Sequence, residues 1–174
     1  QGSVLAPTLF LLNINDLLSS TVNSIHSYAD DSSLHSSFSF SKPPSHPDLL
    51  DRREQISISL NADLEAVSLW GANNRTTFNS NKSQYIAFTN RSQITTSSIQ
   101  FINSVIPCSS SIDILGVKIT KNLSWTEHIQ NIYKTASQKL GLLYKTKPYF
   151  NDEQLLTIYK SHIRSQMEYC SPVW

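Results

Sequence analysis

The segment from residue 49 to residue 71 constrains the fold most, because it predicts one long amphipathic helix. Its apolar residues recur every three or four positions and so fall on one stripe of a helix. The stripe consists of Ile56, Leu60, Leu64, Val67 and Trp70. Such a face must pack against another element, and the apolar fraction of 39% is typical of a folded chain. The segment therefore indicates a domain with a hydrophobic core.

Other segments predict a mixture of helices and strands. Residues 8–20 have helical periodicity directly after Pro7, and residues 24–38 predict two short strands around a tight turn. Residues 41–47 contain three prolines and predict a loop. Further strands are predicted at residues 85–89, 98–106 and 112–119. This mixture favours an α+β fold.

Two helices are predicted in the last third of the chain. Residues 124–127 have the pattern of a capping box, and the helix that they open carries a long apolar stripe. The stripe contains Trp125, Ile129, Ile132, Tyr133, Ala136, Leu140 and Leu143. The final helix begins near Asn151, where Asp152 and Glu153 complement its positive end. Its predicted stripe is Leu155, Tyr159, Ile163 and Met167.

Charge is distributed unevenly along the chain although the net charge is only +1. Residues 1–75 hold 4 Lys and Arg against 8 Asp and Glu, and residues 76–174 hold 10 against 5. An acidic half suits a metal site and a basic half suits a polyanion, but charge alone favours ordinary solvated surface for both. Neither a signal sequence nor an apolar run of membrane-spanning length is present, and both chain ends read as cuts in a longer polypeptide.

Cysteine and histidine give little indication of a metal or disulfide site. Cys108 and Cys170 lack motif spacing, which favours reduced thiols. The histidines also lack the spacing of a zinc site, which favours surface or packing roles. They are His26, His35, His46, His128 and His162.

The segment Tyr28-Ala29-Asp30-Asp31 carries the clearest chemical signal. Two adjacent carboxylates at the tip of a predicted hairpin repel each other and suit a cation. Asp is also common in turns for conformational reasons, so the isolated pair is better explained as a turn, and the surrounding sequence decides its interpretation. The residues before it read Q-G-S-V-L-A-P-T-L-F from Gln1 to Phe10 and lead into the predicted first helix.

Taken in order, these segments resemble the reverse transcriptases of non-LTR (LINE-type, jockey-like) retrotransposons. The Q-G-S-x-L-x-P-x-L-F segment and Y-A-D-D resemble the motifs lettered B and C of that family. Asn81-Lys82-Ser83 before residues 84–89 resembles the lysine-bearing motif D. Residues 115–129 resemble the hairpin and thumb entry, and residues 159–170 resemble the thumb helix. Nearly the whole chain is covered, and the five matches in order are far more specific than any one alone.

The resemblance implies a partial palm subdomain in residues 1–120, an antiparallel sheet with helices on one face, followed by a truncated helical thumb in residues 121–174. It implies an RNA-directed DNA polymerase that extends a DNA primer on an RNA template with deoxynucleoside triphosphates. The cofactor would be Mg²⁺, with Mn²⁺ able to substitute. The family implies action in the nucleus after assembly in the cytoplasm, with no membrane involved.

The family's site residues carry over to matching positions. Asp30 would be the metal-binding carboxylate, with Asp31 as its neighbour in a lesser role. Tyr28 would pack under the primer end and Ala29 would lie beneath the template and primer. Lys82 would face the triphosphate and donate a proton to pyrophosphate. The alternative for Lys82 is an ordinary solvated lysine in a turn. The remaining two residues, Gln1 and Gly2, would lie beside the incoming nucleotide, where a missing Cβ lets the backbone approach closely.

Three departures from the family pattern leave alternatives open. The further metal-binding Asp that the family carries upstream of the Gln-Gly motif is absent, as are the fingers. Ser165 stands where relatives commonly have Pro, and residues 73–75 are unusually polar. The chain is therefore a polymerase fragment, a catalytically inactive truncated copy, or a nucleic-acid-binding remnant that uses Trp125, Tyr144, Tyr149, Lys145 and Lys147.

Overall fold

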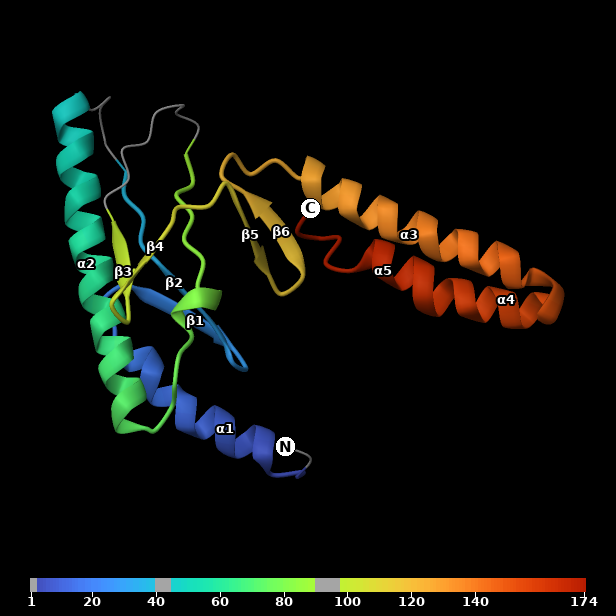
Figure 1. Ribbon diagram of the computed structural model, residues 1–174, viewed down its shortest axis with the longest axis horizontal. Helices are drawn as coiled ribbons and strands as arrows, with labels where there is room; N and C mark the ends of the chain where they lie inside the picture. Colours follow the sequence, from blue (N-terminus) through green and yellow to red (C-terminus); the bar gives the residue numbers. More distant parts are fainter. Residues whose placement is uncertain (1–2, 40–44, 90–97) are drawn as a thin grey trace. The chain divides into compact units, whose positions relative to one another are not determined.

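The computed structural model describes residues 3–39, 45–89 and 98–174, which combine helices with short antiparallel strand pairs (Figure 1). This confirms the α+β class. The chain divides into two compact units. The first comprises Gln1–Ala87 and Arg91–Ser109, and the second comprises Phe88–Asn90 and Ser110–Trp174. The palm and thumb assignments of residues 1–120 and 121–174 stay predictions.

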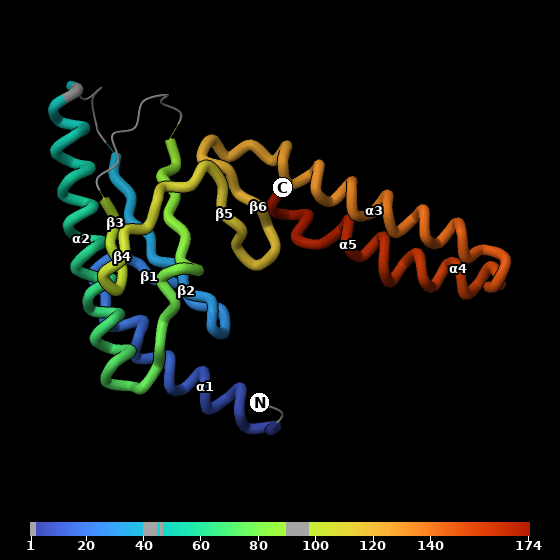
Figure 2. The backbone as a smooth tube through the Cα atoms, in the orientation of Figure 1, coloured from blue at the N-terminus to red at the C-terminus, as the bar shows by residue number. Residues whose placement is uncertain are grey.

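The first unit begins with the helix α1 (Ala6–Ile14), which continues into the 3-10 helix η1 (Asn15–Ser19). The chain then forms a hairpin of β1 (Ser24–Tyr28) and β2 (Asp31–His35), as predicted for residues 24–38. The tube in Figure 2 follows this path from α1 through the hairpin to the long helix α2 (His46–Asn73). The short elements η2 (Ser80–Lys82), β3 (Ile99–Phe101) and β4 (Ser104–Ile106) complete the unit.

The helix α2 confirms the strongest sequence prediction, although it begins three residues earlier than expected. Ser45 is its N-cap and forms a capping box with Asp48, so Pro47 lies in the first helical turn instead of in a loop. A proline is tolerated there because the first turn has no intrahelical acceptor for its missing N–H. The hydrogen bond from the Ser45 hydroxyl also lowers the pKa of the Asp48 carboxyl below its usual value.

The core of the first unit forms where α2 meets the first helical segment and the β3–β4 hairpin. Val67 and Trp70 are buried there, and Leu60 and Leu64 pack against the same cluster, as the helical stripe predicted. The other buried members are Ile14, Leu17, Ile99, Phe101 and Ile106. The rings of Trp70, Phe78 and Phe101 follow one another at centroid distances of 6.3 and 6.0 Å. Burial of these side chains is the main stabilising term for the unit.

The helix α1 is apolar around most of its circumference, but it is covered only near its end. Ile14 is buried, whereas the leucines of the preceding turns are more than half exposed. These exposed residues are Leu5, Leu9, Leu11 and Leu12. A helix that is apolar on all sides is normally buried, so this surface is unusually apolar for a solvated helix.

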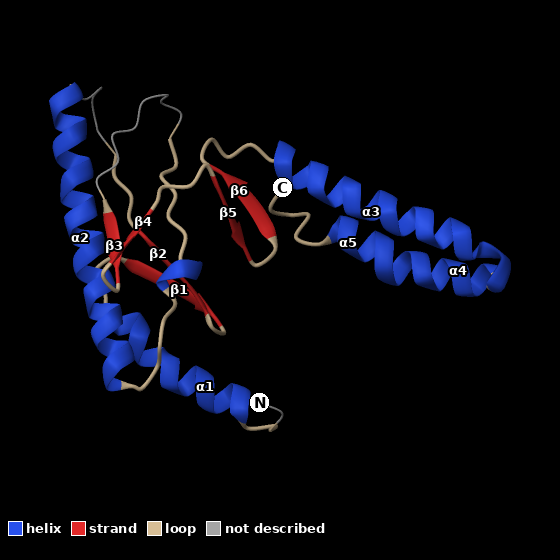
Figure 3. Cartoon of the chain, in the orientation of Figure 1, coloured by secondary structure: helices blue, strands red, loops and turns tan. Residues whose placement is uncertain are grey.

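Two strand predictions in the first unit were wrong in detail. Residues 98–106 were predicted as one strand, but β3 and β4 pair as a hairpin because Ile102 and Asn103 both adopt positive φ. Residues 85–89 form no strand; Tyr85 makes a single parallel bridge to Cys108. Figure 3 marks the resulting strand pairs, which among the described residues are three separate two-stranded sheets and not one larger sheet.

The second unit begins with a hairpin of β5 (Ser111–Ile114) and β6 (Val117–Thr120). The sequence alternation of residues 112–119 predicted one strand, but the chain reverses at Leu115 and Gly116, which both have positive φ. The helix α3 (Thr126–Thr146) follows, then the 3-10 turn η3 (Lys147–Tyr149). The last elements are α4 (Asp152–Ile158), the π-helical segment η4 (Tyr159–Arg164) and α5 (Ser165–Glu168).

The predicted capping box at the start of α3 was wrong. The N-cap is Trp125, which provides no side-chain hydrogen bond to the helix. Thr120 explains the difference: its hydroxyl accepts from the Ser124 N–H and donates to the Ser124 carbonyl oxygen. These bonds fix Ser124 outside the helix, so α3 starts at Thr126. The predicted start at Asn151 is confirmed, since Asn151 caps α4 in a box with Gln154.

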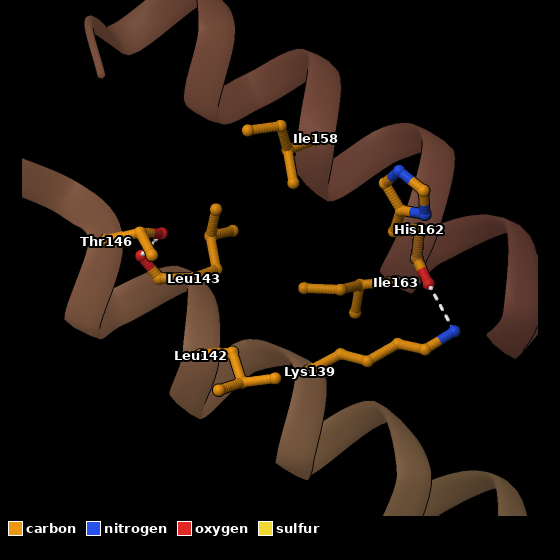
Figure 4. Close-up of a pocket in the computed structure, with 7 residues that line it drawn as sticks. All are labelled: Lys139, Leu142, Leu143, Thr146, Ile158, His162 and Ile163. Atoms are coloured by element: carbon orange, nitrogen blue, oxygen red, sulfur yellow. Dashed lines mark hydrogen bonds between the residues drawn. The ribbon is translucent and has the colours of Figure 1, made fainter. Parts of the chain in front are cut away.

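The helix α3 packs against η4 and α5, and a small open pocket of about 210 Å³ is lined by residues of α3, α4 and η4. Figure 4 shows its lining, which is mostly apolar and includes Leu143, Ile158 and Ile163. Across it, the Lys139 ammonium group donates a 3.2 Å hydrogen bond to the His162 carbonyl oxygen. Ile163 is buried as predicted, but Met167 is 47% exposed.

None of the helices in the described ranges is both long enough and apolar enough to span a membrane.

Candidate functional site

The β1–β2 hairpin presents the two candidate metal ligands at its tip. The ladder runs from the pair Ser24 and His35 to the pair Tyr28 and Asp31, so Ala29 and Asp30 alone form the turn. The stem is held by side chains on both faces. The Ser27 and Ser32 hydroxyl oxygens lie 2.7 Å apart, and the His26 and His35 rings stack at 5.0 Å. The sequence therefore builds a short, registered stem below the Asp30–Asp31 pair.

The turn itself carries backbone strain. Ala29 has a φ of 53°, which an L-residue adopts at a cost of about 1–2 kcal/mol. Two-residue hairpin turns with positive φ at the first position usually place Gly there, because Gly has no Cβ to clash. Ala29 holds the required conformation without that freedom, and strained residues of this kind often occur at functional sites.

The side chains at the tip are open to solvent. Asp30 and Asp31 are exposed, and the Tyr28 ring is 69% exposed. Two adjacent carboxylates offer the hard oxygen donors that Mg²⁺ prefers, so the chemistry of the pair fits the implied cofactor. The donor set is incomplete, since residues 3–39, 45–89 and 98–174 contain no group of three or more His, Cys, Asp or Glu side chains that could hold a metal ion.

Lys82 ends the short helix η2 in the same unit and is exposed. Its N–H donates to the Asn79 carbonyl oxygen at 3.1 Å, so the turn rather than the ammonium group fixes its position. Within the described part of the chain, no ion pair joins Lys82 to Asp30 or Asp31. The two remaining predicted residues, Gln1 and Gly2, lie outside the described residues.

The sequence interpretation missed the group that attaches the hairpin to α2. Asp63 is 3% exposed, and its carboxylate accepts hydrogen bonds from the N–H groups of Val22 and Asn23 at 2.8 and 2.9 Å. The Asn23 side-chain amide donates a third bond at 2.7 Å and also reaches the Ser59 hydroxyl. The available signal was position: Asp63 interrupts the α2 stripe, three residues after Leu60 and four before Val67.

The second unit carries the candidate nucleic-acid surface, which we define as the exposed residues Tyr133, Lys134, Tyr144, Lys145, Lys147 and Tyr149. Its three tyrosines are 73%, 78% and 81% exposed. Trp125 does not join this surface, because it is half-buried with its ring 6.4 Å from that of His128. Lys139 is also left out of this surface, since its ammonium group binds the His162 carbonyl oxygen.

Comparison of the whole chain with protein-family models, curated proteins and solved structures gave no match.

Proposed function

We propose that this chain is part of an RNA-directed DNA polymerase of the non-LTR retrotransposon type. The observation that supports this most is the pair Asp30 and Asp31, exposed at the tip of a two-residue hairpin turn. That geometry agrees with what the Y-A-D-D resemblance implies for a metal-binding turn. The preceding helix α1 and the following helix α2 also stand in the order that the resemblance implies.

In the proposed function each residue of the hairpin tip has a separate role. Asp30 would supply the principal carboxylate to Mg²⁺, which when bound stabilises charge on the attacking and leaving oxygens of the transferred phosphate. Asp31 begins β2 and pairs with Tyr28, so the hairpin ladder fixes its backbone directly after Asp30. The exposed Tyr28 ring would offer an apolar surface to the primer end. Lys82 would act on the triphosphate from the same unit.

The proposal also accounts for why residues 1–174 are not expected to polymerise alone. Two bound metal ions need ligands that fix both in line with the reacting phosphate, and the described residues provide two adjacent carboxylates. The family places another Asp on a strand upstream of the Gln-Gly motif. Without it and the fingers, the positioning of template and nucleotide is also lost, and positioning supplies much of the rate.

A primer-extension experiment tests this function. The upstream segment of a related element, fused before Gln1, should give extension of a labelled DNA primer on an RNA template. Asp30→Asn in the fusion should abolish extension, because the amide retains the shape but loses the charge that holds Mg²⁺. Asp51→Asn, which removes an exposed carboxylate from α2, is the matched control and should remain active.

Two outcomes would contradict parts of the proposal. Full activity of the Asp30→Asn fusion would remove the catalytic assignment of the turn. Robust extension by residues 1–174 alone would show that the site is complete without an upstream segment. A fusion that is folded but inactive in every form would favour a catalytically inactive copy.

A second candidate function is nucleic-acid binding by the second unit without catalysis. The exposed tyrosines and lysines of the candidate nucleic-acid surface support it, since aromatic rings stack on bases and lysines neutralise phosphates. The family resemblance alone supports RNA and DNA as the partners and the nucleus and cytoplasm as the compartments.

A further inference from the structure

A buried carboxylate, that of Asp63, connects α2 to the residues that precede β1. Asp63 is the only Asp, Glu, Lys or Arg side chain that is buried among the described residues. Its carboxylate has no cationic partner in that part of the chain. Both oxygens instead accept from amides: Oδ1 from the Val22 N–H, and Oδ2 from the Asn23 N–H and the Asn23 side chain.

Burying a carboxylate costs several kcal/mol of desolvation. Hydrogen bonds to an ionised acceptor are stronger than neutral ones, which offsets that cost. Only an acceptor with two free oxygens can bind the N–H groups of two successive residues and the side-chain amide at once. The arrangement is therefore specific for a carboxylate and fixes residues 22 and 23 relative to α2.

This anchor lies at the base of the hairpin that carries the candidate metal ligands. Ser24, the next residue, begins β1, and the ladder continues without a bulge to Tyr28 and Asp31. Among the described strands, β1 and β2 pair only with each other. No neighbouring strand among these therefore holds the hairpin in place. Ile25 packs against the core, and residues 22 and 23 bind α2 through Asp63 and Ser59.

We propose that Asp63 is a positioning residue for the Asp30–Asp31 turn. It fixes where β1 begins, and the registered ladder transmits that position over five residues, roughly 17 Å, to the tip. This inference rests on the proposed function, because positioning matters only if the turn holds a metal ion.

The test uses NMR on residues 1–174 with Mn²⁺ as the probe. In Asp63→Asn, one carboxylate oxygen becomes an NH₂ group that faces a donor. Hydrogen exchange of the Val22 and Asn23 amides should become about tenfold faster, the effect of losing a charge-assisted bond. The Mn²⁺ concentration that half-broadens the signals of residues 28–32 should rise several-fold. Asn23→Ala removes only the side-chain donor and should have a smaller effect of the same sign.

Two control variants on the same helix separate positioning from general stability. Glu65→Gln removes an exposed carboxylate two residues away and should change neither measurement. Val67→Ala creates a cavity in the core and lowers the Tm, but it should leave the Mn²⁺ midpoint unchanged. If Asp63→Asn raises that midpoint no more than Val67→Ala does, the role of Asp63 is merely structural and the inference is overturned.

The metal-free spectra distinguish this inference from the proposed function. If the unaltered chain shows no broadening at the turn in millimolar Mn²⁺, the proposed metal site fails. The positioning inference is then decided by chemical shifts. Changes in Asp63→Asn that extend from Val22 to Asp31 support it, and changes confined to residues 22–24 overturn it.

Discussion

The hydroxyl group of Tyr169 donates a 2.8 Å hydrogen bond to the carbonyl oxygen of Leu115. Fifty-four residues separate the two in sequence, and the bond joins the segment after α5 to the turn of the β5–β6 hairpin. Gly116, at the same turn, lies beside the Tyr169 ring, which is 3.6 Å from where a Cβ would stand. This contact therefore ties the end of the helical segment to the hairpin that opens the second unit.

Tyr169→Phe should destabilise the second unit by about 1 kcal/mol or less. A hydrogen bond contributes about 0.5–1.5 kcal/mol net, and half of the Tyr169 side chain is exposed to competing water. Urea unfolding measures the change. Tyr133→Phe is the control, because that ring is largely exposed, and it should have no effect; equal losses in both variants would contradict the role given to Tyr169.

Gly71→Ala and Gly141→Ala should change stability in opposite directions. A Cβ on Gly71 would stand 2.7 Å from the Thr76 carbonyl oxygen and 2.9 Å from the Phe78 ring, so we expect a loss of about 1–3 kcal/mol from overpacking. A Cβ on Gly141 meets nothing within 4 Å, so its higher helix propensity should add up to about 1 kcal/mol. Thermal unfolding of both variants measures these changes. A gain of stability in Gly71→Ala would contradict the predicted overpacking.

Ala29→Gly should stabilise the β1–β2 hairpin slightly. Relief of positive-φ strain should raise the free energy of unfolding by about 1–2 kcal/mol. The greater backbone freedom of Gly in the unfolded chain should lower it by about 0.5–1 kcal/mol. Ala62→Gly, at an exposed position within α2, should instead cost about 1 kcal/mol. Chemical denaturation measures the change in stability of both variants. A similar loss of stability in both would mean that the turn is not strained.

Replacing Lys134, Lys145 and Lys147 with Ala should flatten the salt dependence of single-stranded nucleic-acid binding. Each phosphate contact contributes about 0.7 to the slope of log affinity against log salt, so the slope should fall by up to about 2. Lys139→Ala should leave the slope unchanged, because that ammonium group already binds the His162 carbonyl oxygen. Fluorescence anisotropy at several salt concentrations measures it. An unchanged slope in the triple variant would identify these lysines as ordinary solvated surface.

The elements that the sequence predicted well are those with strong local signals. The α2 helix has five regularly spaced apolar residues, and the β1–β2 hairpin has the turn-forming Asp30-Asp31 pair between its apolar segments. The strand pattern did not predict the reversals within residues 98–106 and 112–119, although the family resemblance implied a hairpin beginning near residue 115. Ile102 and Leu115 are apolar, yet both adopt positive φ, so the turn residues Asn103 and Gly116 that follow them were included in the predicted strands.

The candidate site was predictable only in part. The Asp30–Asp31 pair is adjacent in sequence, so its position at the tip follows from the hairpin alone. The anchor that holds the hairpin is not local, since Asp63 and Asn23 are forty residues apart and meet only after α2 packs. The only sequence signal of that contact was a charged residue, Asp63, within the apolar stripe of α2. The predicted capping box failed for a local reason, because the Ser124 N–H and carbonyl groups bind the Thr120 hydroxyl and hold Ser124 outside the helix.

The π-helical turn at Tyr159–Arg164 has a consequence for how this chain can change in length. Half-buried or buried positions fall at 155, 158, 163, 166 and 170, with a step of five across the π-turn where an α-helix would give three or four. That extra residue shifts the inward-facing positions after it, among which are Ile163 and Gln166. Deleting one residue between 159 and 164 would restore an ordinary α-helix but turn the Tyr169 hydroxyl away from Leu115.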